Sequence, residues 1–474
     1  MQLVHSICKY TTEVSVIGKD DSVIFPKRAL HFPSQRKSSG YNPKCNDDKA
    51  TFSVISENNR IFASKIRLYS MIVREQYIKK IQPFMDKPVV KVITGIRRSG
   101  KSELMKMLQG VLAERGVQQE QIVYINYESL RWEQYRDYRS LYNYVDEVRS
   151  KLNGQRIYVF VDEIQEVEEW ERAVNSMLAD WDADIYITGS NSRLLSSELA
   201  SYLAGRYVEC VVYPLSYGEF LKFHNYSVES PESRLAYFEQ YLRQGGFPAF
   251  HVAPFETDTI YQMVQDIYAS VLLRDTVQRF RIRNIDMLDR LVQFLFDNIG
   301  NTFSAKSITA YLKNQKRAID AETLYNYLQA LESSFIISKV QRYDTKGKEL
   351  LQTGEKYYVA DLSLTYARRG YAPELIAGML ENLVYVELLR RGYRVFVGKQ
   401  GKAEVDFIGV RQEETVYVQV CESMDSDVTR ERELKPLREI KDNYPKYIVL
   451  GTPSGAGNIE GIQCRYIGDF LSES

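Results

Sequence analysis

The sequence is poor in the residues that build disulfide and metal sites. It has only five cysteines and four histidines in 474 residues, and no two cysteines form a CxxC pair. An odd, scattered set of cysteines argues against a disulfide framework or a zinc finger and indicates a reducing compartment, so we expect the cytoplasm. The histidines are too dispersed to predict a histidine-based metal site.

Long apolar runs and an excess of one charge are also missing. The longest apolar runs, such as residues 157–161, fall far short of the about 20 residues that a membrane helix needs, so we expect no membrane partner. Lys+Arg and Asp+Glu each number 62, which argues against a wholly basic nucleic-acid coat but leaves a local basic face open. With 44% hydrophobic residues the chain can bury cores, and its length predicts about two to four domains.

Residues 1–70 differ from the rest of the chain. They show no sustained helical or strand period, and residues 34–49 are rich in loop-forming residues. An amphipathic helix pattern begins at Met71. Two interpretations stay open: an upstream extension, with translation naturally beginning at Met71, or a disordered arm with its own partner.

A phosphate-binding motif follows a predicted buried strand. The β-branched run at residues 89–94 predicts the strand, and residues 103–108 favour a helix. Between them GIRRSGKS fits the P-loop pattern GxxxxGKS, in the strand–loop–helix context that the motif requires. The residues predicted to bind nucleotide are Gly95, Ile96, Arg97, Arg98, Ser99, Gly100, Lys101 and Ser102.

The residue types in this loop match the chemistry of phosphate binding. Gly95 and Gly100 let backbone N–H groups turn toward phosphates, and the following helix directs its positive end at them. We expect Lys101 to reach the β- and γ-phosphates and to act as a catalytic residue, and the Ser102 hydroxyl to ligate Mg²⁺. A nucleotide with Mg²⁺ is therefore the expected ligand.

An acidic pair ends a second predicted strand. The apolar run at residues 157–161 leads directly into Asp162 and Glu163. An aspartate at the carboxyl end of a strand can hold Mg²⁺ through water, and an adjacent glutamate can polarise the attacking water. Together with the P-loop, this pair predicts Asp162 as a metal ligand and Glu163 as a catalytic residue.

Further strand patterns complete a parallel sheet. Residues 121–126, 184–188 and 207–213 favour strands, and the helical segments between them imply crossovers that cover both faces. Ser190 and Asn191 follow the strand at 184–188, where they could read the γ-phosphate or cap a short turn. The nucleotide site belongs at the carboxyl edge of this sheet.

These residues resemble a known family. The P-loop, the strands VFVDEIQ and ITGSNS, and the segment LAGRY at 203–207 are similar to prokaryotic AAA-type ATPases of the AAA-14 class. The later segments GGFP, LLRDTVQRF and AEVDF resemble the C-terminal domain DUF4143 that usually accompanies it. The resemblance implies ATP as the nucleotide, Glu163 as the water-activating base, and Arg206 as an arginine finger or anchor. An arginine donated between subunits would imply a homo-oligomer, whereas the residue pattern alone favours a surface charge at Arg206.

The region after the ATPase core predicts helices and then a hairpin. Residues 288–296, 306–313 and 321–332 favour helices, and residues 335–340 and 356–359 favour two strands. This order is typical of a winged helix-turn-helix with the hairpin as its wing, so DNA is a candidate partner.

The presumed recognition helix gives this DNA hypothesis little support. It carries two acids and no basic residue, and Asn326 and Gln329 are its only candidates for reading bases. The alternative is a winged helix used as an interdomain or oligomer lever, with an unknown protein partner.

The last part of the chain has the order of a PD-(D/E)XK nuclease core. A predicted helix with Glu381 and Glu387 precedes strands with Asp406 and Gln419. In such cores a glutamate, an aspartate and an E/Q-x-K pair surround Mg²⁺ and activate water. Cys421 stands where the lysine belongs and supplies no cation. We therefore predict a nuclease-like fold that has lost nuclease activity.

Together these patterns predict an α/β protein in four parts after residue 70. They are a parallel-sheet P-loop ATPase core at 71–225, a helical linker or lid at 226–284, a winged helix at 285–372 and a PD-(D/E)XK nuclease-like domain at 373–474. The expected function is Mg²⁺-dependent ATP hydrolysis that moves the C-terminal domains. The alternative is a slow nucleotide-gated switch or scaffold that binds DNA or a protein, and an active DNA nuclease is a third hypothesis.

Overall fold

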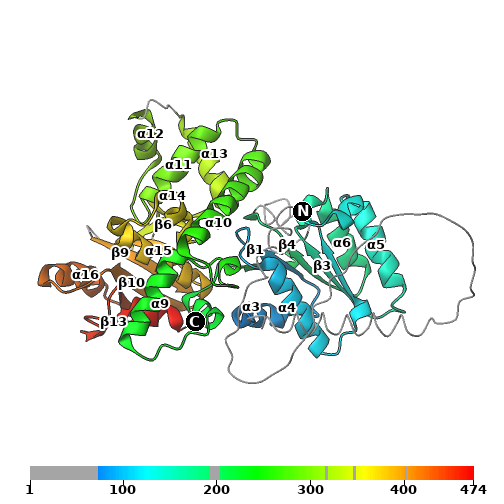
Figure 1. Cartoon of the computed structure of the whole chain (residues 1–474), viewed down its shortest axis with the longest axis horizontal. Coiled ribbons are helices and arrows are strands. Elements are labelled where there is room, and N and C mark those ends of the chain that lie inside the picture. The colour runs from blue at the N-terminus through cyan, green and yellow to red at the C-terminus, as the bar shows by residue number, and fades with distance from the viewer. Residues whose placement is uncertain are drawn as a thin grey trace, which may run out of the picture. The chain divides into compact units, whose positions relative to one another are not determined.

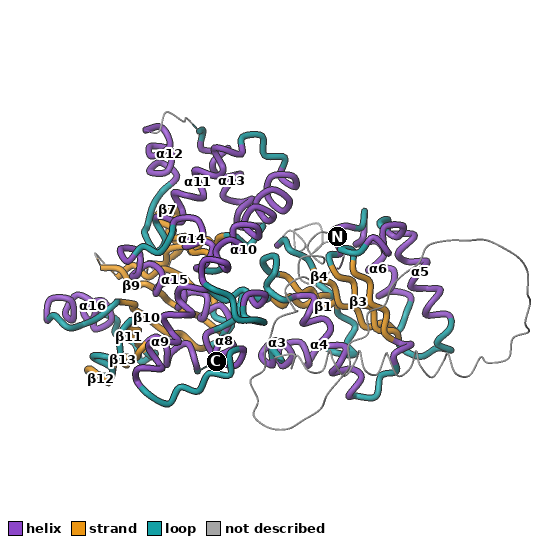
Figure 2. Tube along the Cα trace, in the orientation of Figure 1, coloured by secondary structure: helices purple, strands orange, loops and turns teal. Residues whose placement is uncertain are grey.

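The computed structural model describes residues 73–192, 203, 205–314, 319–344, 349–400 and 403–473. Contacts group the chain from Ile72 to Ser474 into one compact unit, whose elements are shown in Figure 1 and Figure 2. Both interpretations of residues 1–70 concern a segment outside the described residues. In the described part of the chain, no helix is long and apolar enough to cross a membrane.

The first sheet is fully parallel, with the strand order β2-β3-β4-β1-β5. Its strands are β1 (Val90–Thr94), β2 (Ile122–Asn126), β3 (Ile157–Asp162), β4 (Ala183–Thr188) and β5 (Tyr207–Val211). Each strand is a short run rich in β-branched and aromatic residues, the composition that a sheet covered on both faces selects. The predicted parallel α/β core is confirmed.

Helices cover both faces of this sheet. They are α3 (Glu75–Ile81), α4 (Lys101–Glu114), α5 (Tyr138–Ser150) and α6 (Trp170–Asp180). Leu104 of α4 shares one buried core with Ile93 of β1, and Val174 of α6 shares a second core with Val92 of β1. Because neighbouring strand residues point to opposite faces, α4 and α6 lie on opposite sides of the sheet. The carboxyl ends of its strands form one common edge.

The second sheet has eight strands, in the order β12-β13-β11-β10-β9-β8-β6-β7. Its strands are β6 (Ile337–Asp344), β7 (Glu349–Val359), β8 (Arg394–Gln400), β9 (Ala403–Arg411), β10 (Glu414–Cys421), β11 (Lys446–Leu450), β12 (Gly457–Ile459) and β13 (Ile462–Tyr466). Two helices, α15 (Ile376–Arg390) and α16 (Asp427–Glu439), contribute to two separate cores of this sheet. Leu388 shares the first core with Val418, and Leu437 shares the second with Ile448.

The hairpin β6–β7 belongs to this second sheet. β6 pairs in parallel with β8, with Arg342 opposite Val397. The expected boundary between 285–372 and 373–474 therefore divides a single sheet, and the hairpin does not form a unit apart from the last domain. The physical reason is that β8 satisfies the backbone groups that a free wing strand would leave open at its edge.

The remaining helices surround these sheets. They are α8 (Tyr217–Phe223), α9 (Pro231–Gln244), α10 (Thr257–Ser270), α11 (Ile285–Asp297), α12 (Ala305–Asn314), α13 (Ala321–Ser333), α14 (Leu362–Arg369) and α17 (Ile467–Ser472). Helix α10 continues into a π-helical segment, Val271–Gln278. Three helices, α11 to α13, precede the hairpin in the predicted order, while the assignment as a winged helix stays a prediction.

Candidate nucleotide site

The P-loop adopts a backbone conformation that requires its glycines. Gly95 has φ +138°, and a Cβ atom built there would lie 2.2 Å from the carbonyl oxygen of Val212. Gly100 has φ +97° and precedes the first residue of α4. Side chains at these positions would strain the backbone, and a side chain at Gly95 would also collide with the carbonyl of Val212, the residue after β5. The loop therefore turns tightly from β1 into the amino end of α4.

Lys101 is buried in this loop. Its side chain is directed back along the P-loop, and Nζ donates to the carbonyl oxygens of Gly95 at 3.0 Å and Ile96 at 3.2 Å. Burial lowers the pKa of Lys101, and the nearby carboxylates of Glu163 and Asp162 partly oppose this effect. The ammonium group is thus available beside the two predicted acidic residues at the sheet edge.

Asp162 and Glu163 follow β3 at the same edge. Asp162 is fully buried, and it accepts hydrogen bonds from Thr188 Oγ1 and, at 3.0 Å, from Tyr124 Oη. Glu163 has φ +57°, its amide donates to Thr188 Oγ1 at 2.9 Å, and its carboxylate accepts from Gln165. These contacts hold the two carboxylates in different settings: one inside the sheet, the other on a turn next to the P-loop lysine.

Other predicted residues contribute polar groups to the same edge. Ser190 and Asn191 are buried directly after β4, which lies between β1 and β3. The hydroxyl oxygens of Ser99 and Ser190 are buried and have no hydrogen-bond partner among the described residues. Because buried polar atoms are normally paired, these two hydroxyls fit a site that receives a polar ligand.

The other side chains of the P-loop differ in how deeply they are buried. Ile96 is buried, whereas Arg97 forms an ion pair with Glu128 at 3.4 Å. Arg98 lies in the left-handed region at φ +68°, and Ser102 is half-buried in the first turn of α4. Arg98 therefore lies at the surface of the loop, whereas the side chain of Arg97 is only 15% exposed.

Arg206 lies at the opposite edge of the first sheet. It precedes β5, whose first residue Tyr207 pairs with Val90 at the start of β1. The four steps from Val90 to Thr94 span roughly 13 Å at the usual strand rise. The Arg206 guanidinium donates to Asn175 Oδ1 at 2.6 Å. The fold does not bring Arg206 to the chain's own P-loop, so a role toward another copy's site stays a proposal.

Two residues that sequence patterns missed reach the nucleotide site from the π-helical segment. Arg274 forms an ion pair with Glu166 at 2.8 Å, three residues after Glu163. Asp275 is 2% exposed, and its Oδ2 has no hydrogen-bond partner in the part of the chain that the structure describes. Burial raises the pKa of Asp275, and Arg97, Arg279 and Lys101 oppose this rise. Both residues lie in the segment LLRDTVQRF, which is one of those that resemble DUF4143, but the resemblance assigns no role to them.

A third residue that sequence patterns missed, Arg74, contacts the backbone of the P-loop. Arg74 is 3% exposed and pairs with Glu219 at 2.8 Å through two guanidinium nitrogens. A third nitrogen donates to the carbonyl oxygen of Ser99 at 2.9 Å. Charge-assisted bonds of this kind fix a buried group firmly. Arg74 thereby connects the P-loop with α8.

The predicted nuclease-like residues separate into two groups. Lys356 of β7 contacts the carboxylates of Glu381 and Asp406 at 2.8 and 3.6 Å, which shows that these two acids lie near one another. Burial alone would lower the pKa of Lys356, but the carboxylates, Glu381 first, outweigh it and raise the pKa. Glu387 instead pairs with Arg390 and Arg391.

The cation beside the carboxylates of Glu381 and Asp406 therefore comes from β7, and the assignment of a nuclease-like fold stays a prediction. Gln419 Oε1 accepts a hydrogen bond from the Asp406 amide at 3.3 Å. Cys421 is buried among apolar residues, and burial raises the pKa of its thiol to about 12. Among the described residues, no group of three or more His, Cys, Asp or Glu side chains could hold a metal ion.

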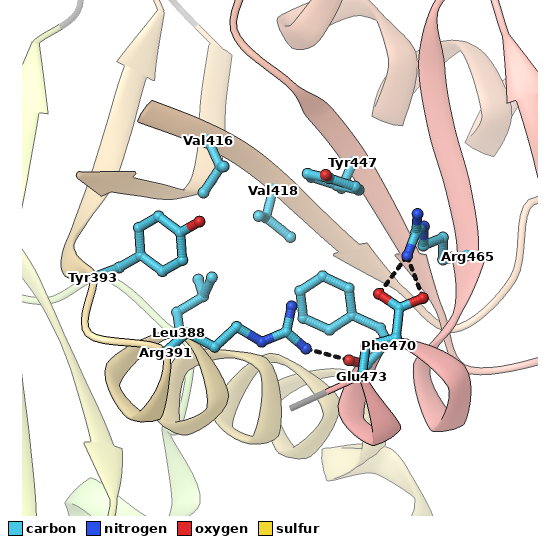
Figure 3. Close-up of a pocket in the computed structure, with 9 residues that line it drawn as sticks. All are labelled: Leu388, Arg391, Tyr393, Val416, Val418, Tyr447, Arg465, Phe470 and Glu473. Carbon is cyan, nitrogen blue, oxygen red and sulfur yellow. Dashed lines mark hydrogen bonds and ion pairs between the residues drawn. The ribbon is translucent and has the colours of Figure 1, made fainter. Parts of the chain in front are cut away.

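A small cavity in the second sheet is not a ligand site. It has about 50 Å³ and lies between α15, the strands and α17, as Figure 3 shows. Arg391 donates to the carbonyl oxygen of Phe470, and Arg465 pairs with Glu473, so both cations are already engaged. The volume suits one or two water molecules.

Comparison with known proteins gives long matches. An uncharacterised protein of Haemophilus influenzae is 37% identical over 404 residues, which cover 85% of this chain and 99% of that protein. An uncharacterised protein of Methanocaldococcus jannaschii is 30% identical over 416 residues, which cover 84% and 87%. The chain belongs to the family of these proteins.

Two family models match separate parts of this family member. Residues 87–221 match AAA_14, an AAA domain, and residues 235–374 match DUF8612, a domain of unknown function. The first match includes the P-loop and the Asp162–Glu163 pair, so the core is a P-loop AAA-type domain. The resemblance to DUF4143 is not confirmed, since DUF8612 matches instead.

Solved structures give only distant likenesses. Cdc6p from Pyrobaculum aerophilum is 12% identical with a TM-score of 0.27, covering 66% of this chain and 93% of that one. The Aeropyrum pernix ORC1 protein, solved in complex with DNA, is 13% identical with a TM-score of 0.26, covering 63% and 91%. Scores this low support no conclusion about this chain.

Proposed function

We propose that this protein is a Mg²⁺-dependent ATPase whose nucleotide state controls the position of its C-terminal region. The observation that carries the proposal is the meeting of two motifs at one sheet edge. Lys101 is buried in a glycine-dependent P-loop, with Asp162 and Glu163 beside it. This arrangement provides a cation for phosphates and an acid for water activation within one site.

The donor set fits Mg²⁺. Protein sites usually hold this ion with one or two carboxylates together with substrate phosphates and water. Asp162 and the Ser102 hydroxyl supply oxygen donors of that kind, and bound Mg²⁺ would neutralise charge on the phosphates. The unpartnered hydroxyls of Ser99 and Ser190 support a polar occupant at the same edge.

Each residue then has a definite part. The P-loop amides and Lys101 bind the phosphates, which draws the ammonium away from its own loop carbonyls. Asp162 would help to hold Mg²⁺ through water, and Thr188 and Tyr124 hold its carboxylate in place. Glu163 accepts a proton from the attacking water as a general base. Asn191 and Ser190 are placed to contact the γ-phosphate.

The first test compares two lysines of α4 in the full chain. We expect Lys101→Ala to abolish ATP turnover and weaken ATP binding at least tenfold, because it removes the buried phosphate-binding cation. Lys106→Ala is the matched control, since Lys106 is exposed on the same helix and pairs with Glu103. Phosphate release and fluorescent-nucleotide binding measure the two effects. Equal turnover in wild type and Lys101→Ala would contradict the proposal.

A slow nucleotide-gated switch is the second candidate. It is favoured by the contacts that tie the nucleotide site to the later helices, Arg274 with Glu166 and Ser334 with the backbone of Asp275. In that case ATP binds and hydrolysis is very slow, while the C-terminal region presents a surface to a protein or DNA. Retained binding with no turnover in the wild-type chain would select this candidate.

A further inference from the structure

A basic concavity in the described part of the chain lies outside the nucleotide site. An open cleft of about 470 Å³ lies between residues 279–283 and α13. It is lined by Arg279, Phe280, Arg281, Ile282, Arg283, Thr323, Asn326, Tyr327 and Gln329. These lining residues include three arginines and no carboxylate, so the cleft is a positively charged surface beside a helix with exposed amides.

We propose that this cleft binds duplex DNA, with the arginines on the phosphate backbone and α13 at the major groove. Arg281 and Arg283 are exposed, and neither forms an ion pair with a described residue. Unpaired guanidinium groups on one surface are the usual phosphate contacts of DNA-binding proteins, and their binding releases counterions.

The backbone at Arg281 supports a role beyond a chance surface charge. The amides of Arg281 and Ile282 donate to the carbonyls of Gln278 and Val277, which is a Schellman ending of the helix. The residue in the left-handed position of this motif is usually glycine, as it is at Gly116 after α4. Arg281 occupies that position with φ +52°, an unfavourable conformation for an L side chain. The two hydrogen bonds of this ending hold the backbone of Arg281, which lines the cleft.

DNA binding at this cleft does not require basic residues on α13. The positive charge comes from another segment, which the fold brings next to the helix. Glu332, one of the two acids of α13, lines a different concavity together with Phe335 and Lys339. Asn326 and Gln329 are exposed on the cleft side, and amide side chains suit the adenine edge in the major groove.

The chemistry favours duplex DNA over other nucleic acids. The major groove of B-form DNA admits an α-helix, whereas that of A-form RNA is too narrow and deep. Single strands are usually held by stacking bases on exposed aromatic rings. The aromatic residues of this cleft are buried, as Tyr327 is, or half-buried, as Phe280 is.

The cleft connects directly with the nucleotide site. Arg279 belongs to the cleft and interacts electrostatically with Asp275, whose carboxylate in turn interacts with Lys101. DNA that draws Arg279 away would leave the Asp275 charge less compensated. The DNA-binding proposal itself does not depend on ATP hydrolysis.

The test measures DNA affinity rather than turnover. Full-length protein is titrated into a fluorescein-labelled mixed-sequence duplex at several salt concentrations. We expect Arg281→Gln/Arg283→Gln to weaken binding at least tenfold and to reduce the slope of log K against log[salt] by about 2, because roughly 0.9 counterion is released per phosphate contact. Arg131→Gln/Arg139→Gln removes the same charge from exposed positions of the ATPase domain and should change affinity less than twofold.

Further outcomes separate this proposal from its rivals. Unchanged thermal unfolding of the cleft variant shows that lost affinity is not lost folding. A wild-type chain that does not bind the duplex at low salt, or equal losses in the two double variants, would overturn the proposal. Tighter binding of duplex RNA or of a single strand would overturn the assignment to duplex DNA. A failed Lys101 test with intact DNA binding would leave this proposal standing and remove only the ATPase.

Discussion

Replacing one carboxylate oxygen of Glu163 by an amide nitrogen should reduce ATP turnover and leave ATP binding nearly unchanged. The turn conformation of this residue and its amide bond to Thr188 do not depend on the charge of the side chain. We expect Glu163→Gln to retain ATP affinity within about threefold while turnover falls about 100-fold or more, the usual contribution of a general base. Glu168→Gln, an exposed acid after the same strand, is the control. Comparable turnover in the two variants would assign water activation to another group.

Asp275 should influence ATP affinity, because its carboxylate lies near the predicted phosphate site. Two negative groups at short range repel, so we expect Asp275→Asn to tighten ATP binding about three- to tenfold, corresponding to roughly 1 kcal/mol. The exposed residue Asp266 on α10 provides the control Asp266→Asn. Equilibrium binding at low and high salt measures the change, which salt should reduce only weakly at a buried site. Weaker binding would mean that Asp275 helps to hold the metal.

The same substitution should change the pH dependence of stability. Burial raises the pKa of Asp275, so the folded chain keeps its proton to higher pH than the unfolded chain does. The stability contributed by this group is therefore present below the unfolded pKa and is lost as pH rises through the folded pKa. Asp275→Asn should raise the Tm at neutral pH and flatten the acidic side of the profile of Tm against pH.

At the residue scale, sequence patterns can predict which side chains share the sheet edge, whereas the catalytic and binding roles of these residues stay predictions. Lys101, Asp162 and Glu163 follow strands whose parallel arrangement fixes their common edge, so spacing along the chain is sufficient. Arg74 and Lys356 could not be found in this way. Arg74 pairs with Glu219 at a separation of 145 residues, and only the fold shows that their side chains meet.

At the scale of elements, the P-loop depends on the short helix α3 that precedes it. Removing the guanidinium in Arg74→Ala leaves Glu219 buried without its partner, and breaking such a pair costs about 3–5 kcal/mol. Lys79→Ala removes an exposed cation from the same helix and should cost less than about 1 kcal/mol. Denaturant unfolding gives both values. A difference below about 1 kcal/mol between the variants would show that Arg74 does not stabilise the loop.

Elements also show why the second sheet was harder to predict than the first. In the first sheet β1, β2, β3 and β5 are each followed by a helix in the described residues, and the handedness of such crossovers restricts the strand order. In the second sheet β6 and β8 pair across the intervening β7, α14 and α15. No turn signal or alternation in the sequence specifies that pairing, so the sequence predicts the hairpin only as the wing of a winged helix.

At the scale of the whole molecule, one chain of contacts leads from the nucleotide site to the second sheet. Ser334 accepts a hydrogen bond from Thr276 Oγ1 at 2.8 Å and donates to the carbonyl of Asp275 at 3.0 Å. It follows α13 directly and lies three residues before β6. A movement of the π-helical segment would therefore reach both the cleft and the hairpin.

This connection predicts where nucleotide binding alters dynamics. ATP added to the Glu163→Gln chain should change amide hydrogen exchange in residues 271–283 and at the start of β6, because phosphates compete with Asp275 for the charges around it. Exchange in β11 and β13, which pair with one another at the far side of the second sheet, should not change. Ser334→Ala removes both hydrogen bonds and should confine the response to the P-loop and the π-helical segment. If the hairpin still responds in Ser334→Ala, the signal passes through other contacts, of which the bond from Arg390 to the Pro214 carbonyl is the next to remove.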